Sequence, residues 1–382
     1  MLKVFMSYAS DDRSLVDPYF QKLQGAKFAP WMDHRSILPG ADWSREILLA
    51  IERCEVMILF CSPRSVSKTG FVQAEARLAI EKLKYSPEEF ITVIPAMLEP
   101  CEVPRHVRER VQIVDLTTDG AVDRLLQSLE LAASQRKIAY EKGTIAGPFT
   151  VFTESLSKKR TEIPKYDLQI QYPSFMSTSN PSAADALSLV FAGEAHATLI
   201  DQLTEHDTEV GNEGDAWWNA MQTTYTQGFQ VVFANNLFVS VLTMIDTYYR
   251  GAAHGNSHFK TWNFRLDGVT RSAPLQSLFT DEQAGLARLS ELAIKGIERE
   301  YWKRVGERPD AEAMKWISEG AGAKWQNFRN FNLDDVGVTV HFSPYSVAAY
   351  VFSSFSICLS YFDLLEVLKP DGLHSKLAHP HC

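Results

Sequence analysis

Short apolar runs alternate with segments whose apolar residues recur at helical spacing through the first third of the chain. The runs predict strands at Val4–Ser7, Phe28–Met32, Val56–Cys61, Ile91–Met97 and Val111–Leu116. The periodic segments predict helices at Asp11–Gln24, Trp43–Ile51, Phe71–Leu83 and Ala121–Ala139. Five strands that alternate with helices are typical of an α/β protein with a doubly wound, flavodoxin-like parallel sheet covered by helices on both faces.

The loops that follow the first two predicted strands indicate where a ligand would bind. Ser7 and Tyr8 end the first strand, and the segment Asp33–Gly40 follows the second. Ligands of doubly wound sheets bind in the crevice beyond the carboxyl ends of the strands. Because both loops leave that edge of the sheet, we expect them to border a common site.

The pattern changes after Ala139, where Gly143, Gly147 and Pro148 indicate a linker over residues 139–150. An α+β module is expected to follow. Its predicted strands are Tyr166–Tyr172, Phe229–Ala234, Leu237–Tyr248, Val338–Phe342 and Tyr350–Leu359, and its predicted helices are Ala183–Gln202, Asp281–Arg304 and Tyr361–Leu368. Asn235-Asn236 predicts a hairpin turn between two of these strands. The predicted domains are residues 1–138, the linker 139–150, a module at 151–372 with an optional division into 151–250 and 251–372, and a flexible tail at 373–382.

Composition and charge narrow the classes of partner. The chain has 382 residues, of which 38 are basic and 47 acidic, and its net charge of −9 disfavours nucleic acid, since phosphate binding requires a basic face. The sequence shows no basic leader and no unbroken apolar stretch of roughly 18 residues, so we expect neither a signal peptide nor a membrane partner. The five cysteines are widely spaced and include no CxxC pair, which favours a cytoplasmic protein without disulfides.

Three short motifs occur in order along the N-terminal segment. They are Phe5-Met6-Ser7-Tyr8-Ala9 with Asp11-Asp12, the segment Asp33–Gly40 ending in Leu38-Pro39-Gly40, and Phe60-Cys61-Ser62-Pro63-Arg64-Ser65. At these spacings residues 1–135 resemble a TIR domain. The first motif matches the first box of that family, the second matches its second box and the following loop, and the third matches the end of its third strand. The resemblance implies the same five-stranded parallel sheet.

The resemblance also implies a candidate catalytic residue. Many TIR domains bind adaptor proteins without catalysis, whereas others cleave NAD at the nicotinamide–ribose bond and release ADP-ribose or a cyclic isomer. These enzymes rely on a glutamate at the start of the third helix, usually four residues after an aromatic residue, and Phe71-x-x-x-Glu75 fits this pattern. Phe71 stands where bacterial members more often carry Trp, which keeps ring stacking but removes the indole N–H.

A single carboxylate suits this chemistry. Loss of nicotinamide leaves a ribosyl cation that resembles the oxocarbenium state of glycoside hydrolysis, and an ionised Glu75 would stabilise its positive charge. Nicotinamide is already a cationic leaving group, so a second carboxylate is not required as a general acid. NAD would then be the substrate, with no cofactor. The alternative for Glu75 is a solvated residue near a helix N-terminus, where a negative charge is mildly favourable.

Further residues of the same edge are candidates for NAD binding. Ser7 and Tyr8 would contact the nucleotide from the first strand, or would only pack at its end. Gly40 and Trp43 lie in the loop that covers the nucleotide in family enzymes, where Trp43 would either stack on a ring or be a core residue at a helix start. Arg35 would contact a phosphate or remain solvated. Neither GxGxxG nor GxxxxGK[ST] occurs, which disfavours a dehydrogenase or a P-loop protein.

Several motifs of the second half resemble a known pair of domains. They are Tyr248–Asn256, which is similar to a Gly-Gly-Ala-His-Gly hairpin, with Trp262–Gly268, Leu275–Phe279 and Phe342–Tyr350. Residues from about 160 to 370 resemble the domain pair of lysozyme-sensing bacterial anti-sigma factors, which also occurs beside some polysaccharide deacetylases. This resemblance implies ligand recognition without catalysis. Ala252 replaces a glycine of that pattern, and the ending Ala348-Ala349-Tyr350 departs from it.

The histidines do not predict a metal site. His254 and His258 are four residues apart, as two ligands on a helix would be, but they flank a turn and would not share a face. The terminal His379-Pro380-His381-Cys382 is better explained as a mobile tail. We therefore expect no bound metal.

Taken with the TIR resemblance, the sequence favours a cytoplasmic, NAD-cleaving effector of bacterial defence against phage. The C-terminal module would sense an unknown protein or ligand, or drive assembly. Active TIR domains generally need neighbours, and family members contact one another through the segment that matches Leu38-Pro39-Gly40, so we expect a homo-oligomer or filament. The alternatives are a non-catalytic TIR scaffold, which would self-associate without consuming NAD, and a virulence factor that mimics host TIR adaptors.

Overall fold

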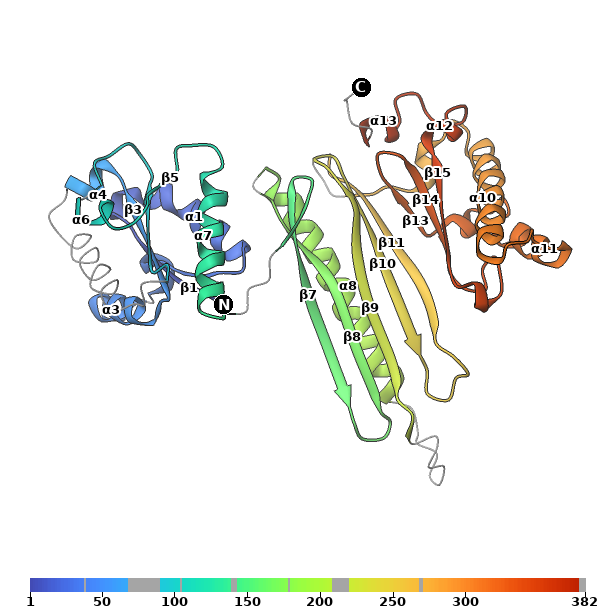
Figure 1. Cartoon of the computed structure of the whole chain (residues 1–382), viewed down its shortest axis with the longest axis horizontal. Coiled ribbons are helices and arrows are strands. Elements are labelled where there is room, and N and C mark those ends of the chain that lie inside the picture. The colour runs from blue at the N-terminus through green and yellow to red at the C-terminus, as the bar shows by residue number, and fades with distance from the viewer. Residues whose placement is uncertain are drawn as a thin grey trace. The chain divides into compact units, whose positions relative to one another are not determined.

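The computed structural model describes residues 1–37, 39–67, 90–103, 105–138, 143–177, 179–207, 220–267 and 271–377. The chain forms two compact units, Met1–Lys142 and Gly143–Cys382, and each has sheets of its own. Figure 1 shows the helices and strands of both units.

A five-stranded parallel sheet with the order β2-β1-β3-β4-β5 lies at the centre of the N-terminal unit (Figure 1). Its strands are β1 Lys3–Ser7, β2 Ala29–Trp31, β3 Val56–Cys61, β4 Val93–Met97 and β5 Val114–Asp115. The described helices are α1 Arg13–Gly25, α2 Asp33–Ser36, α3 Trp43–Arg53, α4 Pro63–Ser67, α6 Arg105–Arg108 and α7 Ala121–Gln135, with the 3₁₀ turn η1 Ser10–Asp12. The predicted α/β class and parallel sheet are confirmed, while the helix predicted at Phe71–Leu83 lies outside the described residues.

Helices cover both faces of this sheet, because its central strand is apolar on both sides. All six residues of β3 are buried. Leu59 shares a core cluster with Ile47 and Ile51 of α3. Its neighbour Phe60 points to the opposite face, where Tyr19 of α1 packs against it with 5.6 Å between the ring centres. The predicted placement of helices on both faces is thus confirmed.

A seven-stranded sheet with the order β12-β11-β10-β9-β8-β7-β6 forms most of the C-terminal unit. Its strands are β6 Thr144–Ala146, β7 Phe149–Arg160, β8 Tyr166–Met176, β9 Thr223–Ala234, β10 Phe238–Tyr248, β11 Asn256–Arg265 and β12 Arg271–Ser272. Neighbours are antiparallel except β8 and β9, which are parallel and therefore need a crossover. Helix α8, Pro181–Asp207, is that crossover and packs on the sheet, with Leu187 and Phe191 in the shared core (Figure 1).

Helix α8 also has the length and composition of a membrane span. Over Pro181–His206 it reaches a mean hydropathy of 1.2, and it is the one helix of the described chain that does so. Polar residues interrupt this segment, so it contains no unbroken apolar run. One face of α8 packs on the sheet through residues such as Leu187, whereas Leu189 and Ile200 on its outer side are 73% and 62% exposed. Helix α8 therefore carries apolar side chains on its outer side as well as against the sheet.

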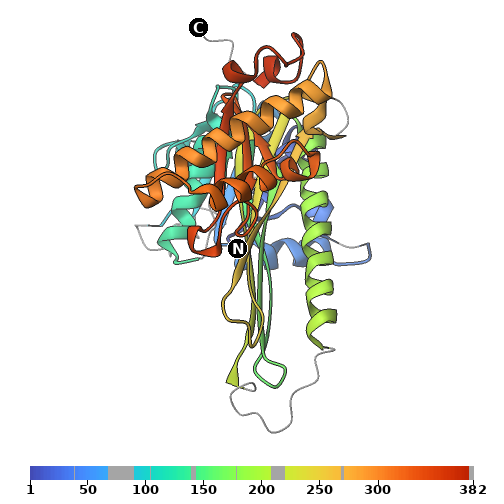
Figure 2. The same ribbon diagram turned by 90° about the vertical axis from the view of Figure 1, so that its right-hand side faces the viewer.

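A three-stranded antiparallel sheet completes the C-terminal unit, with strands β13 Phe331–Leu333, β14 Gly337–Phe342 and β15 Phe355–Ser360. Helix α10, Glu282–Val305, lies across it (Figure 2) and contributes Leu289 and Ile297 to the common core. The Asp281 side chain caps α10 by accepting hydrogen bonds from two backbone N–H groups at 2.9 and 2.8 Å. Gly306 ends the helix with a φ of +81°. The shorter elements are η2 Leu275–Leu278, α11 Ala311–Gly320, η3 Trp325–Phe328, η4 Tyr350–Phe352, α12 Tyr361–Leu364 and α13 His374–Leu377.

Buried polar side chains connect the two sheets of the C-terminal unit. Ser240 Oγ of β10 donates a hydrogen bond of 2.8 Å to Asn263 Oδ1 of β11 and accepts one of 2.8 Å from Asn332 Nδ2 of β13. Asn332 Oδ1 lies 3.0 Å from His341 Nε2 of β14, whose Nδ1 lies 2.8 Å from Ser356 Oγ of β15. Ser240, Asn263, Asn332 and His341 are all buried. Because buried polar groups need these partners, the hydrogen bonds fix one sheet against the other.

Some predicted boundaries in the second half are wrong. Residues 144–146, predicted as linker, form β6, which pairs with β7. The optional division near residue 250 falls within the hairpin of β10 and β11, which belong to one sheet. The predicted tail at 373–382 contains α13, with Leu377 buried. Short or irregular elements of this kind have no periodic pattern of their own.

The C-terminal strands and turns agree with the prediction in part. The turn at Asn235-Asn236 is confirmed, since Asn235 N donates to Phe238 O at 2.9 Å. The strand predicted from Tyr350 begins only at Phe355, because Tyr350–Phe352 form a 3₁₀ turn and Ser353 has a φ of +59°. The helix predicted at Tyr361–Leu368 ends at Leu364.

Candidate functional site

The carboxyl end of β1 places Ser7 and Tyr8 at the predicted edge of the parallel sheet. Both are largely buried, with 2% and 9% of their surface exposed. The Tyr8 hydroxyl donates a hydrogen bond to Asp33 Oδ1 and lies 3.0 Å from His34 Nδ1, the two residues that begin α2. Burial and the hydrogen bond to Asp33 raise the pKa of Tyr8 far above its ordinary value, so its hydroxyl stays protonated. The loops after β1 and β2 therefore meet at this edge.

Arg35 forms an ion pair with Asp17. Its Nε and Nη2 atoms donate hydrogen bonds of 2.9 Å each to the two carboxylate oxygens of Asp17 on α1, and this contact lowers the pKa of Asp17. The guanidinium also lies 4.9 Å from the ring centre of Phe20. A phosphate would have to compete with Asp17 for the same donors. Arg35 is exposed to solvent and paired with Asp17, and a phosphate contact stays a prediction.

A second polar cluster, absent from the predicted site, lies beyond the ends of β1 and β3. Asp12 is fully buried in the turn after β1. It accepts a hydrogen bond of 2.5 Å from Ser62 Oγ and one of 2.9 Å from Arg64 Nη1. Arg64 Nη2 donates another to Glu99 Oε2 at 3.0 Å. Because β1 and β3 are parallel neighbours, the polar residues that follow them meet at one edge of the sheet. A prediction of the strand order would therefore have indicated this cluster.

The cluster also fixes the start of α4. Ser62 Oγ accepts a hydrogen bond from Ser65 N at 3.1 Å, and Ser65 Oγ accepts one from Ser62 N at 2.8 Å. These two bonds satisfy backbone donors at the helix start in a reciprocal cap. Asp12 thus anchors the turn between β3 and α4.

Gly40 lies between α2 and α3, and Trp43 is the first residue of α3. Gly40 has a φ of +92°, and a Cβ there would meet no atom within 4 Å, so the left-handed backbone rather than crowding favours glycine. Trp43 begins α3, which is capped by Asp42 through a hydrogen bond of 3.1 Å from Arg45 N. The Trp43 side chain is 46% exposed, so the alternative of a core residue is wrong and its ring is accessible to a ligand.

Glu75 is the predicted catalytic residue, and Phe71 is predicted to stack on the substrate. Both lie outside the described residues, as does Leu38. At this edge the structure describes the contact between Tyr8 and Asp33, and the exposed ring of Trp43 at the start of α3. Within the described ranges, no group of three or more His, Cys, Asp or Glu side chains is placed to hold a metal ion.

Two family models match separate parts of the chain. Residues 4–128 match the model of the TIR domain, so the five-stranded N-terminal unit contains a TIR domain. Residues 276–361, which include α10 and the three-stranded sheet, match the model described as a protein of unknown function (DUF3298). The chain thus joins an N-terminal TIR domain to a C-terminal DUF3298 domain.

Solved structures are similar to each part. A DUF3298-family protein from Bacteroides fragilis is 18% identical and covers 60% of this chain and 96% of its own, with a TM-score of 0.42. A DUF3298-family protein from Pseudomonas aeruginosa is 14% identical and covers 57% and 94%, with a TM-score of 0.38. The TIR domain of the Toll-related receptor TRR-2 from Hydra magnipapillata is 24% identical and covers 35% and 96%, with a TM-score of 0.28. All three TM-scores are below 0.5, so the domain assignment comes from the family models. No curated protein matches the sequence.

Proposed function

We propose that this protein is a TIR enzyme that cleaves NAD at the nicotinamide–ribose bond, with Glu75 as the catalytic carboxylate. The match of residues 4–128 to the TIR domain carries the proposal, and the position of Glu75 four residues after Phe71 supports it. An ionised carboxylate beside the ribose stabilises the positive charge that develops as nicotinamide leaves. NAD is the substrate of this reaction, and no cofactor takes part.

The described residues at this edge of the sheet support the binding step. Trp43 offers an accessible ring on which a base or the nicotinamide ring stacks. Tyr8 holds Asp33 at the start of α2, and Arg35 ties the same short helix to α1. Both side chains thereby position the segment that leads to Gly40 and Trp43. In this proposal Ser7 forms the floor of the site, and Phe71 stacks on the substrate.

We further propose that the C-terminal module gates the enzyme, by sensing a protein or ligand or by driving oligomerisation. The segment with Gly40 would then join neighbouring TIR domains, and the apolar side chains of Trp43 and Leu48 beside it are 46% and 49% exposed. Such an effector would act in the bacterial cytoplasm in defence against phage. The likeness of the module to anti-sigma factors and deacetylase-associated domains stays a prediction.

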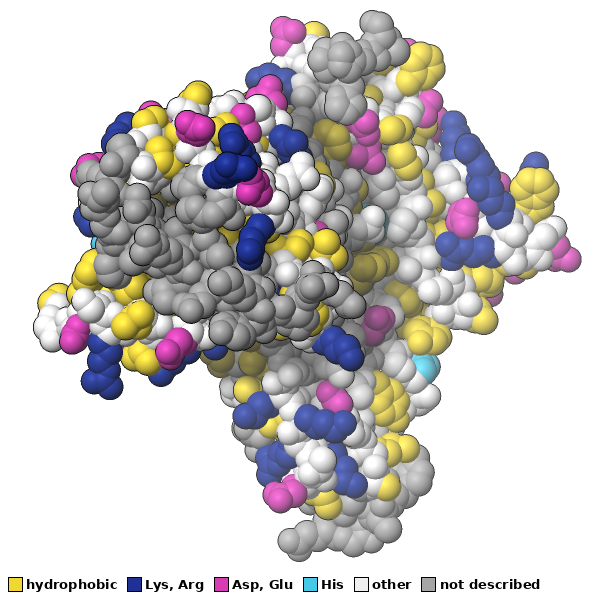
Figure 3. Space-filling model, turned by 60° about the vertical axis from the view of Figure 1, so that its left-hand side comes forward, with side chains coloured by type: hydrophobic (Ala, Val, Ile, Leu, Met, Phe, Trp, Pro, Cys, Tyr) yellow, Lys and Arg dark blue, Asp and Glu magenta, His cyan; other side chains and the backbone are white. Residues whose placement is uncertain are grey.

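The surface charge disfavours nucleic acid as a partner. On the face shown in Figure 3, Lys and Arg side chains are interspersed with Asp and Glu. The net charge is −9. Mixed charge of this kind gives little of the electrostatic attraction on which nucleic-acid binding depends.

Nicotinamide release tests the proposal directly. The purified full chain is incubated with NAD, both dilute and after clustering with a crowding agent, and nicotinamide is measured by chromatography. Glu75→Gln preserves the shape of the side chain and removes its charge, so we expect a rate at least about 100-fold lower. Glu81→Gln is the matched control, because it makes the same change on the same predicted helix more than a turn away, and its rate should be unchanged.

Two outcomes would overturn the proposal. One is no nicotinamide release from either the dilute or the clustered protein. The other is an equal loss of rate in the Glu75→Gln and Glu81→Gln variants. Light scattering on the same samples measures self-association, and an oligomer that releases no nicotinamide would favour the scaffold alternative.

A further inference from the structure

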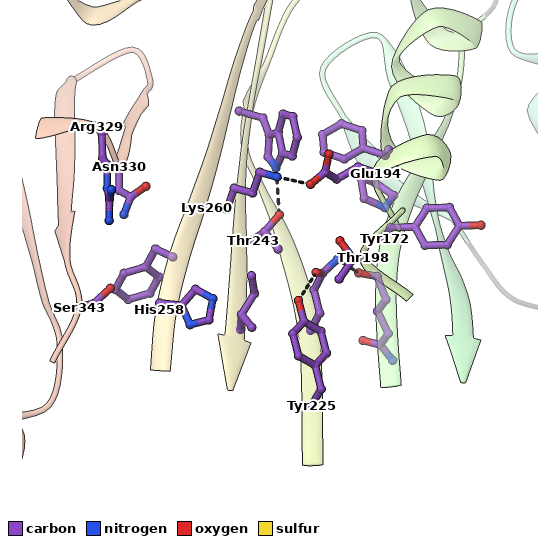
Figure 4. A pocket seen from close by; sticks show the side chains of 17 residues that line it. Tyr172, Glu194, Thr198, Tyr225, Thr243, His258, Lys260, Arg329, Asn330 and Ser343 are labelled. Atoms are coloured by element: carbon purple, nitrogen blue, oxygen red, sulfur yellow. Dashed lines mark hydrogen bonds and ion pairs between the residues drawn. The ribbon is translucent and has the colours of Figure 1, made fainter. Parts of the chain in front are cut away.

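The C-terminal unit contains a pocket of about 340 Å³ on its seven-stranded sheet. Helix α8, strands β8 to β11 and the segments with Arg329, Asn330 and Ser343 surround it (Figure 4). A second pocket of about 390 Å³ shares His258 and these three residues, so the two adjoin. Sites for small molecules commonly have volumes of about 300–1,000 Å³.

On the α8 side, four polar side chains of the pocket pair with one another. Glu194 of α8 forms an ion pair with Lys260 of β11, and Lys260 Nζ lies 4.6 Å from the ring centre of Trp262. Trp262 Nε1 donates a hydrogen bond of 3.2 Å to Thr243 Oγ1. This wall is therefore close to neutral and rich in aromatic rings, namely Tyr172, Phe191, Tyr225 and Trp262.

The other side offers hydrogen-bonding groups that have no partner within the protein. In the described part of the chain, the side chains of Arg329, Asn330 and Ser343 form no hydrogen bond or ion pair. Figure 4 shows Arg329 and Asn330 side by side, facing the strand that carries His258 and Lys260. A guanidinium, an amide and a hydroxyl are thus available to one ligand.

The side of the pocket with Arg329 carries an excess of positive charge. Among the described residues that line the two pockets, Glu194 is the one carboxylate, and Lys260 already neutralises it. The positive charge of Arg329 therefore has no counter-charge in the pocket. Arg binds carboxylate and phosphate groups through paired, charge-assisted hydrogen bonds, which are stronger than neutral ones.

We propose that this pocket binds a small anionic molecule through its carboxylate or phosphate group. Arg329 pairs with the anionic group, Asn330 and Ser343 donate further hydrogen bonds to it, and the rest of the ligand packs on the aromatic wall beside Trp262. The inference goes beyond NAD cleavage and does not depend on Glu75. It gives the C-terminal module a chemical class of ligand, which is a small organic anion.

Ligand-observed saturation-transfer NMR on the full chain tests this, with ribose 5-phosphate and gluconate as the two anionic probes and ribose as the neutral one. Arg329→Gln removes the proposed counter-charge, and Arg308→Gln makes the same change at an exposed position outside the pocket. We expect at least one anion to bind the wild type and Arg308→Gln equally. Its affinity should fall about tenfold or more in Arg329→Gln, as loss of a charge-assisted hydrogen bond predicts.

The two probes separate the sources of the anion. Binding of ribose 5-phosphate alone assigns the pocket to phosphorylated molecules, and binding of gluconate alone assigns it to carboxylates. The proposal is overturned if neither anion binds, if ribose binds as well as they do, or if the two variants weaken binding equally. No NAD is present in this experiment and Glu75 is intact, so its failure would leave the NAD proposal untouched.

Discussion

Acid should weaken the C-terminal unit through His341. This imidazole is 6% exposed between the two sheets, and burial lowers its pKa from 6.5 to about 4. In the unfolded chain it takes up a proton near pH 6.5, whereas the folded protein resists protonation until about pH 4. The unfolded state therefore binds more protons in this window. The stability that is present above pH 6.5 is lost as the pH falls toward 4.

The magnitude follows from the two pKa values. The gap between 6.5 and about 4 corresponds to about 3 kcal/mol once the pH lies below both, at roughly 1.4 kcal/mol for each unit. At pH 5 the unfolded imidazole is mostly protonated and the folded one is mostly neutral, so about 2 kcal/mol is already lost. This is a large part of the roughly 5–15 kcal/mol by which a domain is stable.

Urea denaturation at a series of pH values, followed by tryptophan fluorescence, measures this effect. Of the eight tryptophans, Trp31 and Trp43 belong to the N-terminal unit, so most of the signal comes from the C-terminal one. His341→Gln removes the titrating group but keeps hydrogen-bonding atoms. His196→Gln is the matched control, because His196 is exposed on α8.

Between pH 7 and pH 5, the wild type and His196→Gln should lose about 2 kcal/mol more stability than His341→Gln does. The comparison cancels the carboxylates, which titrate alike in all three proteins. A His341→Gln protein whose stability falls with pH as steeply as that of the wild type would refute the reasoning. The buried hydrogen-bond network would then be insensitive to the charge of its imidazole.

Two further predictions concern charge burial and packing. Asp12→Ala removes the buried partner of Arg64 and should destabilise the N-terminal unit by about 2–3 kcal/mol, whereas Asp17→Ala breaks an exposed ion pair and should cost less than about 1 kcal/mol. Hydrogen exchange in N-terminal peptides measures both, and equal costs would contradict the difference in burial. Gly337→Ala would place a Cβ 2.2 Å from Leu359 O. It should therefore lower the stability of the C-terminal unit by about 1–3 kcal/mol, and an unchanged urea midpoint would show that β14 moves away freely.

Elements with a strong local pattern can be predicted from the sequence. The apolar run Val56–Cys61 predicts β3 to the residue, because a central parallel strand is buried on both faces. The turn at Asn235 is predictable from side-chain chemistry, since Asn235 Oδ1 accepts hydrogen bonds of 2.8 Å from the backbone N–H groups of Leu237 and Phe238. In both cases the cause of the structure lies within a few residues.

Strands that form only because they pair with another part of the chain cannot be predicted from a local pattern. Thr144–Ala146 is short and largely exposed, and it becomes a strand because β7 pairs with it. The β10–β11 hairpin joins residues on both sides of 250 into one sheet, which no local pattern reveals. Sheet membership depends on pairing between strands, and periodicity reports only the burial of each strand.

In the candidate site, too, some contacts can be predicted from the sequence and others cannot. The alternation of strands and helices predicts that the loops after β1 and β2 meet, and the hydrogen bond from Tyr8 to Asp33 bears this out. The ion pair of Arg35 with Asp17 is not predictable, because these residues come from elements whose packing decides the contact. The role of Glu75 rests on resemblance, since it lies outside the described residues.

The boundary between Lys142 and Gly143 has a consequence for how such proteins arise. The polypeptide passes from one compact unit to the other a single time, and the boundary interrupts none of the described strands or helices. One recombination event at this position in a gene would suffice to give the DUF3298-containing module a different N-terminal partner, or to transfer the TIR domain to another protein.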